Sequence, residues 1–375
     1  MNGYDRAAVS ETYFVTGYPG FIGKRLVKYL AQKNVGGRIV LLVQPKFAKE
    51  AAEYASHISG ATLQILTGDV VDMHLGLAGK EYQDLCENVT HIFHLAAISY
   101  LGMPREVAWK VNVEGTRNVL ELARDAKKLE RLVHFSTCYV SGDRVGVIAE
   151  DELEAGQSFR NAYEETKYEA ERLVQRAREQ LPVTIVRPST VVGDSRTGEI
   201  DRFDGPYYLG MLLVLSPLVL PLPLPGNGVA PLNVVPADFV VEATWALAHN
   251  PAAAGKTVHL VDPNPMSARR VYELIAERSN KKLPRFNLSA RAANAILRLP
   301  GLEKLSRPQR AAIDYVNHLA LYSTHTSLEL LDGTGVRCPP LRSYLDKLLE
   351  FAMKAWKERK ELEALDTEDP LDRPQ

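Results

Sequence analysis

The chain has 375 residues, of which 46% are hydrophobic, with 45 basic against 46 acidic side chains. This length and composition can bury the core of one large or two moderate domains, which excludes a small disulfide-held protein. The net charge of -1 argues against a nucleic-acid-binding protein that acts through a broad basic surface. Cys86, Cys138 and Cys338 lie far apart, so neither a disulfide framework nor a zinc cluster is expected, and a reducing, cytoplasmic compartment fits. The first residues carry charges before any apolar run, so no secretory signal is expected.

Short apolar runs alternate with longer amphipathic segments over the first two hundred residues, a pattern typical of βαβ units and a parallel sheet. We predict strands at 12–16, 38–43, 62–67, 91–95, 132–136 and 183–186, and helices at 20–33, 81–87, 106–127 and 161–180. The helix at 106–127 is expected to bury Val107, Val111, Gly115, Asn118, Leu122 and Ala126 on one face. After residue 193 we predict a helix at 237–249, a strand at 257–261 and helices at 268–279 and 344–363. The last helix carries an apolar stripe of Leu345, Leu348, Leu349, Ala352 and Trp356.

One uncharged stretch, YLGMLLVLSPLVLPLPLP at 208–225, is long enough for a membrane span. Four prolines lie in it, and alternate prolines remove backbone donors that a bilayer helix must keep bonded internally. No transmembrane segment is therefore expected. Two interpretations stay open: a helix at 208–216 that leads into an extended Leu-Pro strap, or an apolar surface that lines a pocket for a hydrophobic substrate.

The segment TGYPGFIG at 16–23 directly follows the first predicted strand and opens the first predicted helix. Gly17 permits a tight turn, Gly20 lets the backbone approach a pyrophosphate, and Gly23 allows close packing of the helix on the sheet. The N–H groups and the positive dipole end of the helix suit phosphates. The motif predicts a dinucleotide site formed by Thr16, Gly17, Tyr18, Pro19, Gly20, Phe21, Ile22 and Gly23.

The end of the second strand, LLVQPKFAK, is expected to distinguish the two nicotinamide dinucleotides. An acidic residue there bonds the ribose hydroxyls of NAD, whereas basic residues suit the additional phosphate of NADP. Gln44, Lys46 and Lys49 occupy the stretch, so NADPH is favoured over NADH; the alternative is that both lysines are merely solvated. Loops after the third and fourth strands would flank the adenine and the pyrophosphate, and His94 there is interpreted as packed or capping. These loops contribute Asp69, Val70, Leu95, Ala96 and Ala97.

The segment YEETK at 163–167 would place the Tyr163 phenol and the Lys167 ammonium on one helix face, although this spacing is also common on helix surfaces. A free tyrosine has a pKa of about 10, so acid–base work near neutral pH requires a fall of about three, or about 4 kcal/mol. The Lys167 cation, with the positive nicotinamide of the oxidised complex, is a plausible source of that fall. Thr137 lies just past the fifth strand, where hydroxyls face the ligand crevice of an open α/β sheet. Thr137 and Tyr163 are therefore expected to hydrogen-bond a carbonyl oxygen jointly.

Six segments, TGYPGFIG, HLAAI, VNVEGT, STCYVSG, YEETK and RPSTVVGDSRTGEI, occur in the order and spacing of extended short-chain dehydrogenases/reductases. Within that family the chain most resembles the thioester reductase and fatty acyl-CoA reductase (male-sterility-like) branch, over about 12–271. The last of the six segments is the most specific to this branch. The resemblance implies a catalytic triad of Thr137, Tyr163 and Lys167.

The same resemblance implies further site residues. Asn112 of VNVEGT would support the proton relay, although a structural helix asparagine is an open alternative, and Pro188 and Ser189 would lie beside the nicotinamide. Gln44 stands where the branch usually has an arginine for the NADP phosphate, so either Lys46 takes that role or the preference is weaker. Cys138 follows Thr137 where a sugar-nucleotide dehydratase has an acidic pair, and it is interpreted as a small core residue.

The expected fold is α/β: a Rossmann-type doubly wound parallel sheet with a smaller, partly discontinuous α/β substrate lobe. Residues 1–193, with further elements near 232–262, would form the NADP-binding domain. Residues 194–375 would form mainly the substrate-binding lobe and the C-terminal helices.

The expected activity is an NAD(P)H-dependent carbonyl reductase that transfers hydride to an acyl thioester, aldehyde or ketone with a hydrophobic tail, free or carrier-bound. Tyr163 would donate the proton, Thr137 would hold the oxygen and Lys167 would lower the tyrosine pKa. Two alternatives are a sugar-nucleotide epimerase or hydroxysteroid-type dehydrogenase on the same fold, and a non-catalytic dinucleotide sensor, which the intact triad disfavours. A monomer or homodimer is expected, with no nucleic-acid partner and no metal.

Overall fold

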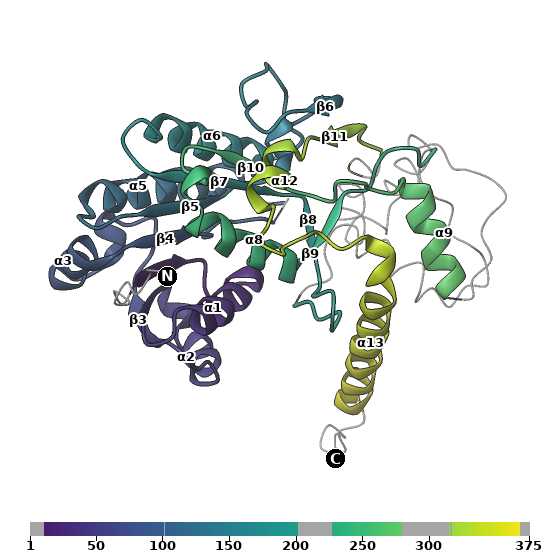
Figure 1. Cartoon of the computed structure of the whole chain (residues 1–375). Coiled ribbons are helices and arrows are strands. Elements are labelled where there is room, and N and C mark those ends of the chain that lie inside the picture. The colour runs from purple at the N-terminus through teal and green to yellow at the C-terminus, as the bar shows by residue number, and fades with distance from the viewer. Residues whose placement is uncertain (1–10, 101, 202–226, 280–314, 316, 368–375) are drawn as a thin grey trace, which may run out of the picture. The chain divides into compact units, whose positions relative to one another are not determined.

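A computed structural model of the chain describes residues 11–100, 102–201, 227–279, 315 and 317–367 (Figure 1). The chain divides into two compact units. The first comprises Met1–Val191, Ala237–Pro263 and Ala320–Cys338, and the second comprises Val192–Pro236, Asn264–Leu319 and Pro339–Gln375. The apolar stretch at 208–225, with its predicted helix at 208–216, lies outside the described residues.

The first unit is built on a seven-stranded sheet in which every strand pairing is parallel. In their order across the sheet the strands are β10 (Thr257–Leu260), β7 (Val183–Pro188), β5 (Arg131–Phe135), β4 (His91–His94), β1 (Thr12–Thr16), β2 (Arg38–Val43) and β3 (Thr62–Thr67). The chain order reverses between β1 and β4, where Thr16 is in register with His94. Ligands of such sheets bind in the crevice outside the carboxyl ends of the strands at this reversal. The arrangement confirms the predicted Rossmann-type doubly wound fold.

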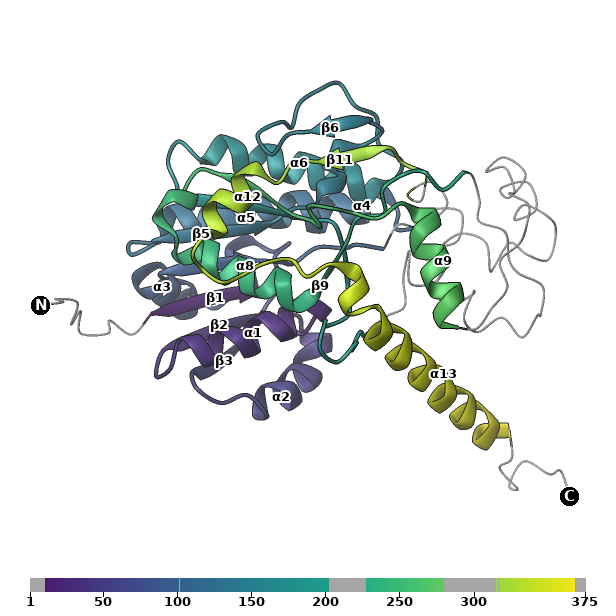
Figure 2. The same ribbon diagram turned by 45° about the vertical axis from the view of Figure 1, so that its right-hand side comes forward.

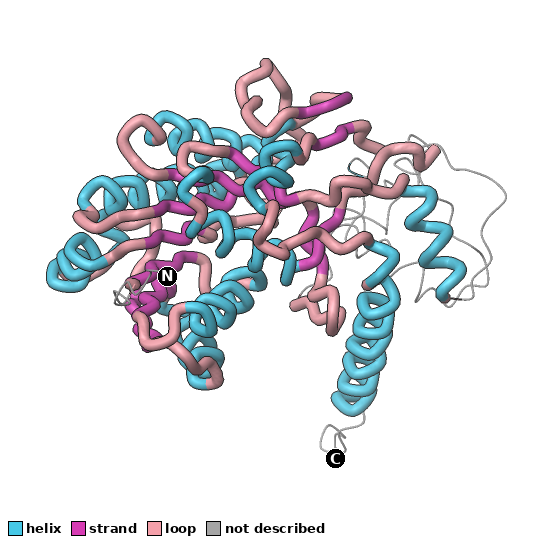
Figure 3. The backbone as a smooth tube through the Cα atoms, viewed as in Figure 1, coloured by secondary structure: helices cyan, strands magenta, loops and turns pink. Residues whose placement is uncertain are grey.

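Helices alternate with the strands and cover both faces of this sheet (Figures 2 and 3). Helices α1 and α8 pack together on one face, and α5 and α6 pack together on the other, with α3 beside α5. The helices of the unit are α1 (Phe21–Lys33), α2 (Ala48–Ser56), α3 (Gly79–Asn88), α4 (Arg105–Trp109), α5 (Gly115–Asp125), α6 (Ala162–Ala177), α8 (Ala237–His249) and α12 (His325–Leu331).

Burial explains why the strands could be recognised in the sequence. All residues of β1, β4, β5, β7 and β10 are buried, as expected for parallel strands that have helices on both faces. Their sequences combine apolar residues with buried polar ones, such as His91 and His94 in β4. The edge strand β3 is only partly buried, whereas β10, at the other edge of the sheet, is fully buried.

The predicted helix at 106–127 is not one regular α-helix. Helix α4 is followed by a π-helical turn over Lys110–Glu114, and α5 begins after it. A π turn adds a residue to the helix and so shifts which side chains face the core. The predicted buried face is therefore wrong at Val107, which is 45% exposed, while Ala108 and Asn112 are buried.

Two further strands and a late helix of the first unit were not predicted. Strand β6 (Gly146–Ile148) pairs in parallel with β11 (Ala320–Tyr322). Glu150 is buried just after β6, and its carboxylate accepts the N–H groups of Thr326 (2.6 Å) and Ser327 (3.1 Å) in the first turns of α12. A carboxylate at this position satisfies helix N–H groups that have no partner within the helix.

The second unit contains β9 (Val234–Pro236), α9 (Ala268–Arg278) and α13 (Leu345–Thr367), and β8 (Thr190–Val192) ends at its first residue. Its core is formed by Val192, Val234, Val271, Leu274, Leu341, Tyr344, Leu345 and Leu348. The predicted stripe on the last helix is confirmed for Leu345, Leu348 and Ala352, which are buried. Among the helices of the described residues, none combines the length and the hydropathy needed to cross a bilayer.

Candidate active site

The glycine loop between β1 and α1 is packed so tightly that no side chain would fit at Gly17 or Gly23. A Cβ on Gly17 would lie 2.8 Å from the Ala96 nitrogen, and φ at Gly17 is +86°, in the region that favours glycine. A Cβ on Gly23 would lie 2.5 Å from the Gly17 carbonyl oxygen. No side chain caps α1 at Gly20, and its first turn contains no acidic residue. The loop and the helix end therefore suit the pyrophosphate of a dinucleotide.

A buried chain of hydrogen bonds links this loop to the π-helical turn. Ala96 donates its N–H to Thr16 Oγ1 (3.2 Å), which is 2.8 Å from His94 Nδ1. His94 Nε2 is 3.0 Å from Thr116 Oγ1, and the Thr116 hydroxyl donates to the Asn112 carbonyl oxygen (2.6 Å). Since a carbonyl only accepts, Thr116 accepts from Nε2–H, and His94 is the neutral Nε2–H tautomer.

The environment of His94 agrees with its interpretation as a packed residue. Burial, together with the charge of Lys167, lowers the pKa of His94 to about 3, so the ring is neutral at physiological pH. Both ring nitrogens are occupied by threonine hydroxyls. The ring therefore fixes the position of the glycine loop relative to Asn112 rather than exchanging protons.

The Asn112 side chain is fully used within the protein. Its Oδ1 accepts the Ile98 N–H (2.7 Å), and its Nδ2 donates to the Ile98 carbonyl (3.1 Å) and to Thr166 Oγ1 (2.9 Å). Asn112 is 1% exposed. It thereby joins the loop after β4 to α6, the helix that carries Tyr163.

Thr137 and Tyr163 meet at the carboxyl edge of the sheet. Thr137 lies two residues past the end of β5 and is buried; its hydroxyl donates to the Pro188 carbonyl (3.4 Å) and accepts the Tyr139 N–H (3.2 Å). Helix α6 begins after Asn161, whose side-chain oxygen accepts the N–H of Glu164 at 3.0 Å, so Tyr163 lies in the first turn. A hydrogen bond joins the side chains of Thr137 and Tyr163.

Lys167 lies one turn further along α6, and its ammonium group also reaches the carboxyl edge of the sheet. Its ammonium Nζ donates to the Phe135 carbonyl oxygen at 2.5 Å, at the end of β5. Burial lowers the pKa of Lys167 to about 8, and the Glu171 carboxylate opposes that change. The cation is therefore the major form at neutral pH.

The expected lowering of the tyrosine pKa by Lys167 is not found in this structure. Burial raises the pKa of Tyr163 to about 12, and the hydrogen bond with Thr137 only partly offsets the rise. The Lys167 ammonium is directed at the Phe135 carbonyl, where that acceptor partly satisfies its charge. Tyr163 is consequently a protonated phenol at neutral pH, the form that donates a proton.

A buried ion pair behind the triad was missed in the sequence. Glu171 on α6 and Arg187 on β7 are 0% and 1% exposed, and Arg187 donates to both Glu171 oxygens at 2.6 to 3.1 Å. Ser136 Oγ, one residue before Thr137, also donates to Glu171 (2.5 Å). The spacing of Glu171 four residues after Lys167 on one helix was the available signal.

The predicted cofactor residues at the ends of β2 and β3 contact one another. Gln44 Nε2 donates to Asp69 Oδ2 at 2.6 Å, and Asp69 Oδ1 accepts the Val71 N–H at 3.2 Å. Lys46 is exposed, with its ammonium 4.9 Å from the centre of the Phe47 ring. The Lys46 ammonium, which solvent can reach, thus lies just after β2. The neighbouring Gln44 side chain is held by its hydrogen bond to Asp69.

The other predicted cofactor residues differ in how their side chains are placed. Tyr18 is buried and donates its hydroxyl to the Ala51 carbonyl (3.2 Å), and Val70 lies in the core, so both can offer a ligand only their backbone. The buried Ser189 hydroxyl has no hydrogen-bond partner among the described residues. Of the remaining predicted cofactor residues, Pro19 and Pro188 are buried and Ala97 is exposed. The others are partly buried: Phe21, Ile22, Leu95 and Ala96.

Comparison with known protein families shows which family the chain belongs to. The family model described as male sterility protein, an NAD-binding domain, matches residues 15–244. The chain belongs to this family. The matched range is more than half of the chain and contains the glycine loop, Thr137 and Lys167. Membership of the male sterility family means a nicotinamide-dinucleotide-binding domain, and it confirms the resemblance to the acyl reductase branch of extended short-chain dehydrogenases/reductases.

Two curated relatives of the chain are longer than it is. The chain is 28% identical over 284 residues to "Fatty acyl-CoA reductase wat" of Drosophila melanogaster, covering 63% of this chain and 54% of that protein. It is 28% identical over 280 residues to "L-2-aminoadipate reductase large subunit" of Penicillium chrysogenum, covering 68% of this chain and 19% of that protein. The chain thus spans about half of the fly relative and about a fifth of the fungal one.

Solved structures agree with the fold. The terminal R domain from the myxalamid PKS-NRPS biosynthetic pathway superimposes with a TM-score of 0.75 at 27% identity, covering 92% of this chain and 91% of that one. The epimerase Mth375 of Methanothermobacter thermautotrophicus superimposes with a TM-score of 0.67 at 19% identity, covering 95% of this chain and 96% of that one. At that identity the second likeness shows the fold alone.

Proposed function

We propose that this protein reduces an acyl thioester or an aldehyde with a hydrophobic tail, using NADPH. The observation that carries the proposal is the meeting of Thr137, protonated Tyr163 and the Lys167 cation at the carboxyl edge of the sheet. The glycine loop lies at the same edge, after β1. Relatives that are named fatty acyl-CoA reductase and L-2-aminoadipate reductase support a carbonyl of this kind.

The chemistry follows from the protonation states of these side chains. A bound reduced nicotinamide supplies hydride to the carbonyl carbon. Thr137 and Tyr163 donate hydrogen bonds to the carbonyl oxygen, which gains negative charge as the hydride arrives. Tyr163 transfers its proton to that oxygen. Lys167 does not lower the Tyr163 pKa in this structure, so its cation is proposed to stabilise the phenolate only when cofactor and carbonyl are bound. With a thioester the product is a hemithioacetal, which releases the thiol and leaves an aldehyde.

The substrate is proposed to be a thioester of coenzyme A or of a carrier protein. The similarity at 27% identity to a terminal R domain of a PKS-NRPS pathway supports a carrier. The similarity to a fatty acyl-CoA reductase supports coenzyme A. Both kinds of substrate present the same thioester carbonyl to Thr137 and Tyr163, so the proposed reaction is the same for either.

Nicotinamide absorbance at a fixed enzyme concentration tests the proposed function. NADPH and NADH are each offered with acyl-CoAs of increasing chain length, an acyl carrier protein thioester, long aldehydes, sterols and nucleotide sugars. We expect NADPH to be consumed with long-chain thioesters or aldehydes, and free thiol to appear with the thioesters. Turnover confined to sterols or nucleotide sugars, or no turnover with any substrate, would contradict the proposal.

Lys46 is proposed to contact the additional phosphate of NADPH. We expect Lys46→Glu to lower kcat/KM for NADPH by about 10-fold or more, because a charge-assisted contact contributes about 1.5–3 kcal/mol, and to leave kcat/KM for NADH nearly unchanged. Lys80→Glu makes the same charge change at an exposed position on α3 and serves as the control. Equal effects of the two substitutions on NADPH would show that Lys46 does not contact the phosphate.

A further inference from the structure

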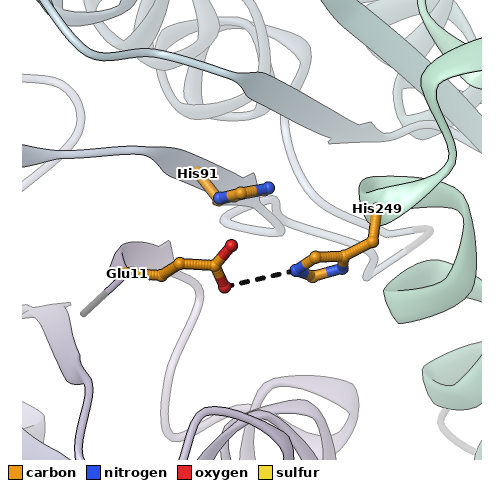
Figure 4. Close-up of side chains that lie close together, drawn as sticks. All are labelled: Glu11, His91 and His249. Atoms are coloured by element: carbon orange, nitrogen blue, oxygen red, sulfur yellow. Dashed lines mark ion pairs between the residues drawn. The ribbon is translucent and has the colours of Figure 1, made fainter. Parts of the chain in front are cut away.

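Two histidines and a glutamate meet at the amino-terminal edge of the large sheet (Figure 4). Glu11 directly precedes β1, His91 is the first residue of β4 and His249 is the last residue of α8. Their nitrogen and oxygen atoms that could bind a metal all lie within 4.8 Å of one another. This edge is the opposite end of the strands from Thr137, so the cluster is separate from the candidate active site.

Hydrogen bonds to the protein hold both imidazole rings by the same ring nitrogen. His249 Nδ1 is 2.9 Å from the Trp245 carbonyl oxygen, which only accepts, so Nδ1 carries a proton, and Nε2 faces Glu11 Oε2 at 3.5 Å. His91 Nδ1 is 3.1 Å from Thr90 Oγ1, which leaves Nε2 for another contact. Metal-binding histidines are oriented in this way, by a hydrogen bond at the nitrogen that does not bind the metal.

The carboxylate is held as well. The Tyr13 hydroxyl donates to Glu11 Oε2 and lies 3.0 Å from His249 Nε2. Carboxylates and imidazoles bind metals in their deprotonated forms, so metal binding at this cluster would release any proton that the ligands hold.

We propose that Glu11, His91 and His249 bind a divalent transition-metal ion such as Zn²⁺, with water completing the coordination. Two imidazole nitrogens and one carboxylate oxygen form a common donor set for zinc. Tetrahedral binding at about 2.0–2.1 Å requires the three donor atoms to approach to about 3.3 Å. Glu11 and His249 are 31% and 25% exposed, so they can make this adjustment and solvent gives the ion access.

The proposed metal has a structural role. Glu11 and His91 belong to the first segment of the unit, and His249 belongs to its second segment, which begins at Ala237. Tyr13 and His249, which are in contact, are 236 positions apart in the sequence. A metal ion at this place would fasten α8 to β1 and β4, and would stabilise the folded unit because the unfolded chain does not bring these ligands together.

Metal binding is tested with the full chain, free of any polyhistidine tag and stripped with a chelator. Zn²⁺ is titrated by calorimetry and Co²⁺ by visible absorption, which responds to the ligands. We expect one ion per chain, and a Tm higher by about 3 °C or more when free Zn²⁺ exceeds Kd about 100-fold. Glu11→Gln and His249→Gln should each weaken binding at least about 10-fold, since each removes one ligand. His57→Gln changes an exposed histidine just after α2 and should bind as the wild type does.

Each outcome of these binding measurements either supports or overturns the proposed metal site. Loss of binding in Glu11→Gln and His249→Gln, with His57→Gln unchanged and circular dichroism spectra alike, supports the site. Failure of the wild-type chain to bind either ion overturns it, as does equal binding by all the variants. If a variant does not fold, electron-nuclear spectra of the wild-type chain loaded with Cu²⁺ decide: coupling to two imidazoles supports the site, and coupling to fewer overturns it. None of these readouts depends on reductase activity.

Discussion

Tyr163→Phe is expected to lower kcat for carbonyl reduction by about 10²- to 10⁴-fold, the usual contribution of a positioned general acid. Tyr163 is the residue that hydrogen-bonds Thr137, and its pKa of about 12 keeps the proton on the phenol until the carbonyl oxygen gains charge. The substitution removes one hydroxyl and keeps the ring, so NADPH binding and Tm should stay close to those of the wild type. NADPH oxidation with the substrate found in the panel, together with cofactor titration by fluorescence, measures both quantities.

A tyrosine on the same helix provides the control. Tyr168 is partly buried, and its ring packs against Phe159 with the ring centres 4.9 Å apart. Tyr168→Phe removes a hydroxyl from α6 without touching Thr137 or Lys167, and its kcat should stay within about twofold of the wild-type value. Turnover by Tyr163→Phe as fast as that of Tyr168→Phe would show that another group donates the proton.

The bounds of the strands could be predicted closely because a buried strand can be recognised from the composition of its own residues. The predicted bounds of β1, β2 and β3 coincide with the structure, and those of β5 and β7 differ by one or two residues. Parallel strands between two layers of helices are short and rich in apolar residues, and longer amphipathic segments separate them. The glycine loop and the YEETK segment were identified for the same reason, since each is a short motif whose meaning depends on the element beside it.

Features that depend on distant partners left no such signal. The apolar period of 106–127 was interpreted as one helix, because nothing in the periodicity announces the π turn that buries Asn112. The carboxylate of Glu150 binds residues beyond position 320, so its burial could not be read from its neighbours. The cluster of Glu11, His91 and His249 forms only when the strand edge and α8 come together.

Glu171→Gln is expected to destabilise the protein by about 3–5 kcal/mol, the cost of breaking a buried ion pair from one side. Arg187 is 1% exposed and would keep its full charge without a carboxylate partner. The amide also leaves Lys167 without the negative charge that supports its protonation, so the Lys167 pKa should fall below about 8. Denaturant unfolding measures the first effect. The second appears as loss of reductase activity at a lower pH than in the wild type, because the Lys167 cation is lost as the pH rises.

A more exposed ion pair, between Glu165 on the same helix and Arg105 on α4, distinguishes the effect of burial from that of charge. Glu165 pairs with Arg105 at 2.7 Å, with half of the Arg105 side chain exposed, and Glu165→Gln should leave the unfolding free energy essentially unchanged. Replacing both buried partners, as Glu171→Leu with Arg187→Met, removes the stranded charge and should recover part of the stability lost in Glu171→Gln. Recovery should be incomplete, because Arg187 also donates to the Glu150 and Glu152 carbonyls, which the double variant leaves unpaired. A Glu171→Gln protein as stable as Glu165→Gln would mean that water reaches Arg187 and that the pair does not hold α6 against β7.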